Sequence, residues 1–286
     1  MKGYRTVLSV AGSDSVGGAG IQADIKTCTA LGVYAMTAVT ALTAQNTTGV
    51  SRVAATEPEM LRAQLDMVLA DVRPDAVKTG MIPDADGVRT VADYIRRFSL
   101  DNVVVDPVMV ATSGDSLCAE DTRRALLESL LPLARVATPN MPEAEALTGV
   151  EITDRASMLR AALELLRATG CGSVLLKGGH GLERCGHADL LLLGPSELSG
   201  EDAAGHFAEP VWLEHPHIDT RNTHGTGCTL SSAIASLLAR GLGVEDAVRG
   251  AVDWLSGAIE SGAGYALGKG HGPVNHLYRI NYGDKS

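Results

Sequence analysis

The segment with the most specific chemistry covers residues 222–228, Asn-Thr-His-Gly-Thr-Gly-Cys, and leads directly into a long apolar helical pattern. Its glycines, Gly225 and Gly227, allow the backbone to approach a ligand closely. The free N–H groups of a helix's first turn, together with the helix dipole, attract a phosphate. Cys228 stands at the start of that helix, where a thiolate is favoured. An ordinary Gly-rich helix start with a small core cysteine is the alternative interpretation.

Carboxylate and amide side chains follow two other apolar runs. Asp106 ends the run Val103–Val105, where a buried carboxylate costs free energy unless something uses it, although it could simply close a turn. Asn140 and Glu143 have the spacing of a helix capping box. Their oxygens could instead lie near a hydrated Mg²⁺ that bridges phosphates. The two interpretations agree in part, because Asn140 could cap the helix while Glu143 turns outward.

Three further segments carry weaker signals. Gln45 follows an apolar strand and offers both a donor and an acceptor, which suits an aminopyrimidine or pyridine edge, or merely a solvated loop. Lys177 stands beside two glycines and could steady a phosphate or lie free on the surface. The Gly-rich segment Ala11–Gly20 fits neither GxGxxG nor GxxxxGK[ST], which disfavours a dinucleotide-dependent oxidoreductase.

Composition narrows the class of protein. The 286 residues carry a net charge of −10 and few aromatic side chains, which argues against nucleic-acid binding. Five widely spaced cysteines form no CxxC pair, and Cys185-Gly-His187 is too isolated for a zinc site. The sequence shows no convincing signal peptide and no run long enough to span a bilayer. We therefore expect a cytoplasmic protein that binds neither nucleic acid nor membrane.

Short apolar runs alternate with helical patterns and must position these side chains. Strands are expected at Thr6–Ala11, Tyr34–Thr43, Val50–Ala54, Ala76–Thr79, Asn102–Val105, Val136–Thr138 and Ser173–Leu176. Helices are expected at Ile21–Leu31, Glu57–Ala70, Asp84–Phe98, Thr122–Leu131, Glu143–Leu147, Arg155–Ala168, Thr226–Leu238 and Val244–Ala263. This order predicts an α/β fold with a mostly parallel sheet and helices on both faces. Ligands bind beyond the carboxyl ends of such strands, where several polar residues cluster: Asp14, Gln45, Lys78, Asp106, Asn140 and Lys177.

The pattern changes after Gly181. Ala188–Leu193 and Phe207–Leu213 are strand-like, with a Gly/Ser/acid-rich link between them. We interpret residues 188–213 as a hairpin or flap. No linker or internal repeat divides the chain, so a single domain over residues 1–286 is expected.

The ordered segments resemble one family over about Thr6 to His276. They are AGSDSVGGAGIQADIKT, TALTAQNT, KTGM, VVVDPVM, TPNMPEAEALTG, LLKGGH, NTHGTGCTLSSAIAS and GHGPVNH. Together they look like the bacterial hydroxymethylpyrimidine/phosphomethylpyrimidine kinases of thiamine biosynthesis, which have a ribokinase-like fold. The resemblance implies a three-layer α/β/α sandwich and a homodimer. It also implies ATP- and Mg²⁺-dependent phosphorylation of 4-amino-5-hydroxymethyl-2-methylpyrimidine and then of its monophosphate.

The same resemblance implies roles for substrate-binding residues. Gln45 would read the pyrimidine edge. The pocket would be lined by Gly12, Asp24, Met81 and Val108.

It also implies roles at the phosphoryl group. Cys228 would help deprotonate the substrate hydroxyl, and the amides of Gly225, Thr226 and Gly227 would form an anion hole. Mg²⁺ and its waters would be organised around the ATP phosphates by Asp106, Asn140 and Glu143, while Lys177 would offset phosphate charge.

Two other functions remain open. A pyridoxine/pyridoxal kinase would share the fold and the phosphate site, although GTGC and the AQN segment favour the pyrimidine enzyme. A non-catalytic pyrimidine-binding regulator would lose the phosphate and metal residues, which are all present here. We expect no fused thiamine-phosphate synthase domain.

Overall fold

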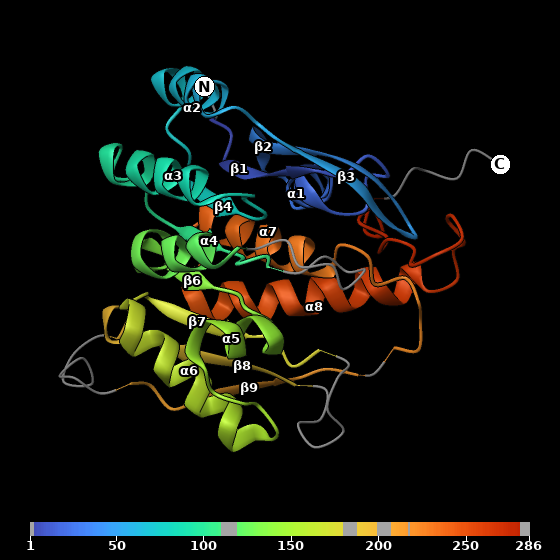
Figure 1. Cartoon of the computed structure of the whole chain (residues 1–286). Coiled ribbons are helices and arrows are strands. Elements are labelled where there is room, and N and C mark those ends of the chain that lie inside the picture. The colour runs from blue at the N-terminus through green and yellow to red at the C-terminus, as the bar shows by residue number, and fades with distance from the viewer. Residues whose placement is uncertain (1–2, 110–118, 180–187, 199–206, 217, 281–286) are drawn as a thin grey trace.

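The computed structural model describes residues 3–109, 119–179, 188–198, 207–216 and 218–280 (Figure 1). Within these residues, nine strands form one sheet in the order β3-β2-β1-β4-β5-β6-β7-β8-β9. The strands are β1 Thr6–Ser13, β2 Tyr34–Asn46, β3 Gly49–Ala55, β4 Ala76–Thr79, β5 Val103–Val105, β6 Val136–Ala137, β7 Ser173–Leu176, β8 Ala188–Leu193 and β9 Val211–Glu214. Neighbours from β2 to β7 run parallel, whereas β3, β8 and β9 pair antiparallel.

The helices lie in two layers, one on each face of the sheet (Figure 1). They are α1 Gly20–Ala30, α2 Pro58–Asp71, α3 Ala85–Arg97, α4 Glu120–Ala125, α5 Met141–Thr148, α6 Arg155–Thr169, α7 Thr226–Ala239 and α8 Val244–Gly262. In β5, Val103 and Val105 pack with α2 to α6, and Val104 packs with α1, α7 and α8. A strand buried on both faces reads as a continuous apolar run, which is why the sequence predicts it. The expected mostly parallel α/β/α architecture is confirmed.

Local chemistry sets several helix boundaries. Asn140 and Asp154 cap α5 and α6 through complete capping boxes. The helix expected at Thr122–Leu131 is shorter, because α4 gives way to a π turn at Leu126–Leu130 and a 3₁₀ turn containing Pro132.

The segment expected to be a hairpin or flap extends the sheet. Strand β8 pairs antiparallel with both β7 and β9, and its side chains are almost wholly buried. The last strand begins at Val211 rather than at Phe207. Residues 199–206 of the link lie outside the described residues, as do Cys118, Cys185 and His187. The pair is therefore a hairpin within the central layer, since the leucines of β8 pack in both cores.

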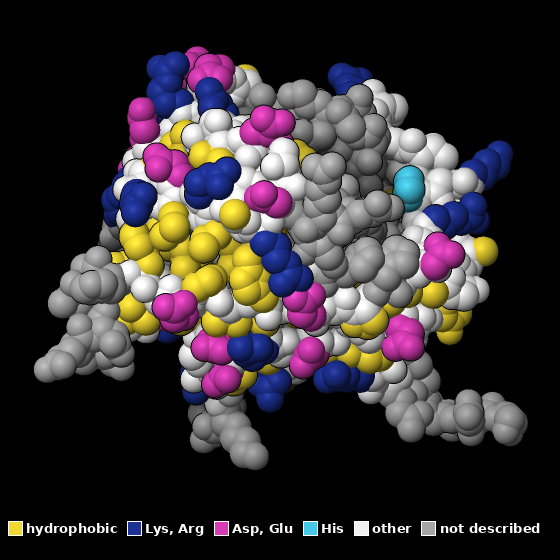
Figure 2. Space-filling view, turned by 90° about the horizontal axis from the view of Figure 1, so that it is seen from below, with side chains coloured by type: hydrophobic (Ala, Val, Ile, Leu, Met, Phe, Trp, Pro, Cys, Tyr) yellow, Lys and Arg dark blue, Asp and Glu magenta, His cyan; other side chains and the backbone are white. Residues whose placement is uncertain are grey.

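Two surface properties bear on the expected partners. Figure 2 shows acidic and basic side chains interspersed over the face that it presents, rather than separated by sign. None of the helices within the described ranges is both long enough and apolar enough to cross a bilayer.

Candidate active site

A cavity of about 510 Å³ lies at the carboxyl ends of the parallel strands and the amino end of α7. Every residue given a site role from the sequence lines it except Asp24, and Lys78, expected among the polar groups at the strand ends, does not line it either. The lining members of that set are Gly12, Gln45, Met81, Asp106, Val108, Asn140, Glu143, Lys177, Gly225, Thr226, Gly227 and Cys228. The fold thus brings ring-reading, carboxylate and phosphate-binding candidates to one space.

The amino end of α7 is open to this cavity. Gly225 is the N-cap residue, with a φ of +81° that favours glycine, and α7 has no side-chain cap. A Cβ atom at Gly225 would overlap the carbonyl oxygen of Gly18. Thr226, Gly227 and Cys228 therefore present first-turn backbone groups to the cavity, and such a helix end binds anions.

Asp106 and Lys177 form the charged centre of the site. The Lys177 ammonium lies 2.9 Å from Asp106 Oδ1 and 4.0 Å from Glu143 Oε2. Burial opposes the charge on Lys177, but Asp106 and Glu143 outweigh it and raise the Lys177 pKa. Asp106 also accepts hydrogen bonds from Thr138 Oγ1 at 3.2 Å and Ser231 Oγ at 3.3 Å. A cationic ammonium is therefore held in place at the centre of the cavity.

Asn140 and Glu143 cap each other's backbone. Asn140 Oδ1 accepts from the Glu143 N–H at 2.9 Å, and Glu143 Oε2 accepts from the Asn140 N–H at 2.8 Å. The idea that Glu143 turns outward while Asn140 caps is therefore wrong, because Glu143 is itself half of the cap and is 4% exposed. Burial raises the pKa of Glu143 to about 7, opposed by Lys177 and reinforced by Asp106.

The carboxylates that line the cavity suit a magnesium ion whose other ligands are water and substrate phosphates. They do not suit a site in which protein side chains supply every ligand. Asp106 and Glu143 both face the cavity near Lys177. Among the described residues there is no group of three or more His, Cys, Asp or Glu side chains arranged to hold a metal. Proteins commonly hold Mg²⁺ through one or two carboxylates, with water and substrate phosphates as the other ligands. The two carboxylates meet that requirement.

Cys228 lies in the cavity, but its sulfur is not poised as a thiolate. Burial raises the pKa of the Cys228 thiol to about 11, although the Lys78 charge and the Gly20 N–H act to lower it. Asp24 and Asp106 add to the increase. A helix N-terminus favours a thiolate, but in the free protein desolvation and two carboxylates outweigh the helix end and keep the pKa of this thiol high.

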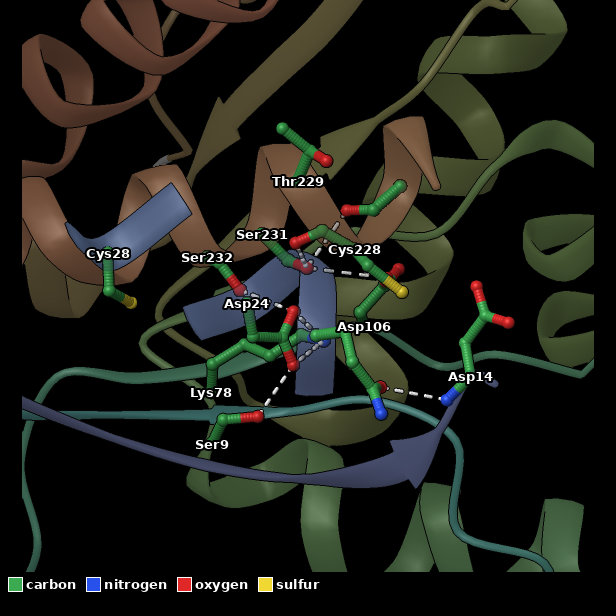
Figure 3. Close-up of polar contacts among 12 residues, drawn as sticks. Ser9, Asp14, Asp24, Cys28, Lys78, Asp106, Cys228, Thr229, Ser231 and Ser232 are labelled. Atoms are coloured by element: carbon green, nitrogen blue, oxygen red, sulfur yellow. Dashed lines mark hydrogen bonds and ion pairs between the residues drawn. The ribbon is translucent and has the colours of Figure 1, made fainter. Parts of the chain in front are cut away.

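Asp24 does not line the pocket, which corrects the role inferred from resemblance. It is fully buried, and its two carboxylate oxygens each lie 2.9 Å from Lys78 Nζ (Figure 3). Ser9 and Ser232 donate hydrogen bonds to it at 2.6 and 2.7 Å. The Gly-rich loop is followed by α1, whose inner face carries Asp24 into the core between β1 and α7.

The cavity is also lined by an amide and by apolar side chains. Gln45 lies within β2, which continues to Asn46 rather than ending before it as expected. Its Oε1 accepts a hydrogen bond from Thr43 Oγ1 at 3.1 Å. Met81 packs close to Gly12, so that a Cβ atom at Gly12 would clash with the Met81 side chain. An amide beside apolar side chains suits the edge and face of a small aromatic ring.

Four ionisable lining residues received no role from the sequence. Asp14 and His224 form one pair, with 2.9 Å between Oδ2 and Nε2. Asp189 and His215 form another, with 3.7 Å between Oδ1 and Nε2, and the Asp189 carboxylate raises the pKa of His215. The position of Asp14 at a strand end was a usable signal. The sequence gives no such signal for His224, Asp189 or His215, because contact between distant segments is not visible in a single sequence.

Comparison with known proteins agrees with this geometry. The family model for phosphomethylpyrimidine kinase matches residues 14–275. The chain is 47% identical over 276 residues to the hydroxymethylpyrimidine/phosphomethylpyrimidine kinase of Rhizobium meliloti, covering 95% of this chain and 97% of that protein. Its identity to the enzyme of the same name from Bacillus subtilis is 44% over 270 residues, covering 94% of each.

Solved structures match the fold closely. A Bacillus subtilis pyridoxal kinase, solved as an ADP complex, superposes with a TM-score of 0.85 at 36% identity, covering 98% of this chain and 100% of that one. A phosphomethylpyrimidine kinase from Clostridium difficile superposes with a TM-score of 0.72 at 35% identity, covering 88% and 99%. The fold is therefore ribokinase-like, and the chain belongs to the phosphomethylpyrimidine kinase family.

Proposed function

We propose that this protein is an ATP-dependent kinase of thiamine biosynthesis. It phosphorylates 4-amino-5-hydroxymethyl-2-methylpyrimidine and then the resulting monophosphate, which gives the diphosphate. The observation that carries the proposal is the shared cavity, which joins Gln45 and its apolar wall to the open amino end of α7. Relatives with this activity in their names match the chain over nearly its whole length.

The acceptor ring occupies the part of the cavity near β2. Gln45 reads the ring edge with its amide, because an aminopyrimidine presents both donors and acceptors. Gly12, Met81 and Val108 shape the apolar faces of the same space. This arrangement directs the hydroxymethyl group toward the phosphoryl site.

Phosphoryl transfer then depends on positioning and charge neutralisation. The backbone amides of Gly225, Thr226 and Gly227 stabilise the transferring group as an anion hole. Lys177 offsets the negative charge of the phosphates, and Asn140 keeps the adjacent helix start in place. Asp106 and Glu143 would hold Mg²⁺, chiefly through water, and the ion would neutralise phosphate charge.

We assign to Cys228 Sγ the proton of the substrate hydroxyl. The thiolate takes this proton as the hydroxyl oxygen bonds to the γ-phosphorus and the bond from phosphorus to the departing ADP breaks. Because burial raises the pKa of the thiol to about 11, the thiol must first lose its own proton to solvent water in the cavity. The buried charge of Lys78 acts in that direction. A loose transition state needs little proton transfer early in the reaction, so an oriented sulfur of this kind suits it.

Resemblance to the family also supports three further parts of the proposal. They are a homodimer, a single domain over residues 1–286 and a cytoplasmic location. Light scattering coupled to size exclusion would test the first of these: a mass near that of one chain, 29.7 kDa, would contradict the dimer.

Pyridoxal kinase is the second candidate, because several structural neighbours with TM-scores above 0.8 bear that name. A coupled assay of ADP release with Mg-ATP separates the two, with hydroxymethylpyrimidine, its monophosphate and pyridoxine offered in parallel and products identified by mass. Turnover of both pyrimidines, well above pyridoxine, is expected. Turnover of pyridoxine with little activity on the monophosphate would overturn the pyrimidine assignment.

A further inference from the structure

Two loops far apart in the sequence meet at the cavity through one carboxylate. The Gly-rich loop after β1 contains Asp14, which is 2% exposed. Asp14 Oδ2 accepts hydrogen bonds from the backbone N–H groups of Gly18 at 2.9 Å and Ala19 at 2.8 Å, and Oδ1 accepts from Val16 at 3.0 Å. The carboxylate therefore fixes the shape of its own loop.

The same carboxylate reaches the loop before α7. His224 Nε2 lies 2.9 Å from Asp14 Oδ2, and His224 is 4% exposed. Because a carboxylate only accepts, the proton of this hydrogen bond belongs to Nε2. Burial opposes the charge on Asp14, but His224 and the loop amides outweigh it and hold its pKa below the usual range. The pair thus stays hydrogen-bonded at neutral pH.

Close backbone packing allows the two loops to fit against each other in only one relative position. A Cβ atom at Gly18 would overlap the His224 ring, and one at Gly225 would overlap the Gly18 carbonyl oxygen. The loop before α7 is held on its other side as well, since the His224 N–H donates to the Gly272 carbonyl at 3.0 Å. A shift of either loop would therefore break contacts at both.

The fit matters because one loop leads into Cys228, which carries the sulfur, and the other leads into Gly20, whose N–H acts on that sulfur. Cys228 belongs to α7 and Gly20 begins α1, and both residues line the same cavity, where the Gly20 N–H acts to lower the pKa of the Cys228 thiol. Gly20 follows directly after the amides that Asp14 holds, and Cys228 lies four residues after His224. Neither Asp14 nor His224 has a chemical role of its own at the sulfur or at the anion hole.

We propose that Asp14 and His224 are positioning residues that lock the Gly-rich loop to the loop before α7, so that Gly20 and Cys228 keep their relative positions in the cavity. The inference rests on the proposed phosphoryl transfer. Displacing reacting groups by about 1 Å lowers the rate by up to about 100-fold. The hydrogen bond between Asp14 and His224 can therefore affect kcat although neither side chain binds the substrate.

The decisive variants are His224→Leu and His224→Gln. Leucine fills space but removes the donor, whereas the glutamine amide can donate from about the place of Nε2. His276→Leu is the matched control, because His276 is equally buried and hydrogen-bonds Thr229 of the same helix at 3.0 Å, yet it does not line the cavity. Asp14→Asn is the second route if His224→Leu fails to fold.

Hydrogen exchange of a peptide covering residues 14–20 reports the lock without any substrate. We expect faster exchange in His224→Leu, or in Asp14→Asn, and wild-type exchange in His224→Gln and His276→Leu. With both pyrimidines, kcat falls about 10- to 100-fold in His224→Leu while the Kd for ATP is unchanged, and His224→Gln recovers most of kcat.

Two results would overturn the lock. One is wild-type exchange in both His224→Leu and Asp14→Asn, and the other is an equal loss of kcat in His224→Leu and His276→Leu. Failure of the wild-type protein to turn over any pyrimidine would instead contradict the proposed function, and the exchange rates would still decide whether the two loops are locked.

Discussion

The ammonium of Lys78 lies 2.9 Å from each carboxylate oxygen of Asp24, and neither side chain reaches solvent. Figure 3 shows this pair from β4 and α1 below Cys228 and beside Asp106, with Ser9 and Ser232 directed at the same carboxylate. Burying two charges costs more free energy than their attraction readily returns. The pair is therefore better explained by the Lys78 charge that it holds close to Cys228 than by a gain in stability.

Removing only one charge of this pair should destabilise the protein severely. In Lys78→Met the Asp24 carboxylate stays buried with two serine donors but without a counter-charge. We expect the free energy of unfolding to fall by about 3–5 kcal/mol, because an uncompensated buried charge carries that cost. Urea denaturation followed by circular dichroism at pH 7 measures it.

The double variant Lys78→Met with Asp24→Leu is the control. Removing both charges should restore much of the lost stability, since well-packed apolar side chains often replace a buried ion pair without loss. A double variant as unstable as the sum of both single variants would show that the two side chains do not compensate each other.

The sequence predicts the strands and most helices because their causes are local. Continuous valine runs such as Val103–Val105 indicate a strand buried on both faces, and the Asn140–Glu143 spacing indicates the observed cap. Turn residues and apolar periodicity carry this information within a few positions. Gln45, Asp106, Asn140 and Lys177 follow from the strand order, because parallel strands deliver their ends to one edge. The wall residues Gly12, Met81 and Val108 are inferred only from the family resemblance.

What the sequence does not reveal depends on contacts between distant segments. Asp24 and Lys78 are separated by 54 positions, so nothing near Asp24 signals that it is consumed by an ion pair. The same holds for the partnership of Asp14 with His224 over 210 positions. The protonation of Cys228 depends on burial by the whole fold, which a helix-terminus argument leaves out.

Alkylation of Cys228 in the free protein should report a protonated thiol. With a pKa of about 11, the thiolate fraction and hence the rate should rise about tenfold per pH unit from pH 7 to 9, because only the thiolate reacts. Iodoacetamide labelling with mass analysis of the Cys228 peptide measures the rate. Fully buried Cys28, whose pKa burial raises to about 12, should stay unlabelled as an internal reference. A rate already level by pH 8 would contradict the raised pKa.

Replacing Cys228 with alanine tests its place in the chemistry. Loss of a proton acceptor at the reacting hydroxyl should lower kcat by about 10²- to 10⁴-fold, and ATP affinity should stay near normal because the α7 backbone amides remain. Steady-state kinetics and calorimetry with ATP measure the two effects. Cys171→Ala, at a buried cysteine in the core beside β7, is the matched control. Unchanged turnover in Cys228→Ala would remove this residue as the base.

Glu143 should make stability fall as pH rises through neutrality. Its pKa is raised to about 7 in the folded protein, so between its ordinary value of 4.5 and about 7 the folded state binds more protons than the unfolded state. Folding is then favoured at the lower pH, and this contribution is lost as pH rises through about 7. Glu143→Gln keeps an oxygen to accept the Asn140 N–H and should flatten the dependence. Thermal unfolding from pH 5 to 8 measures the pH dependence of stability. If stability falls equally steeply with pH in the wild type and in Glu143→Gln, then a group other than Glu143 causes the dependence.

Gln45→Ala should weaken pyrimidine binding selectively. A lost neutral hydrogen bond costs about 0.5–1.5 kcal/mol, so removal of the amide should raise the KM for hydroxymethylpyrimidine by up to about tenfold for each bond it makes. The KM for ATP should not change, because Gln45 lies on β2 and the nucleotide phosphates belong at α7. Asn46→Ala is the control, since the neighbouring side chain is exposed, hydrogen-bonds Thr48 and does not line the cavity. If Gln45→Ala raises the KM for ATP alone, then β2 borders the nucleotide, and the ring must bind elsewhere in the cavity.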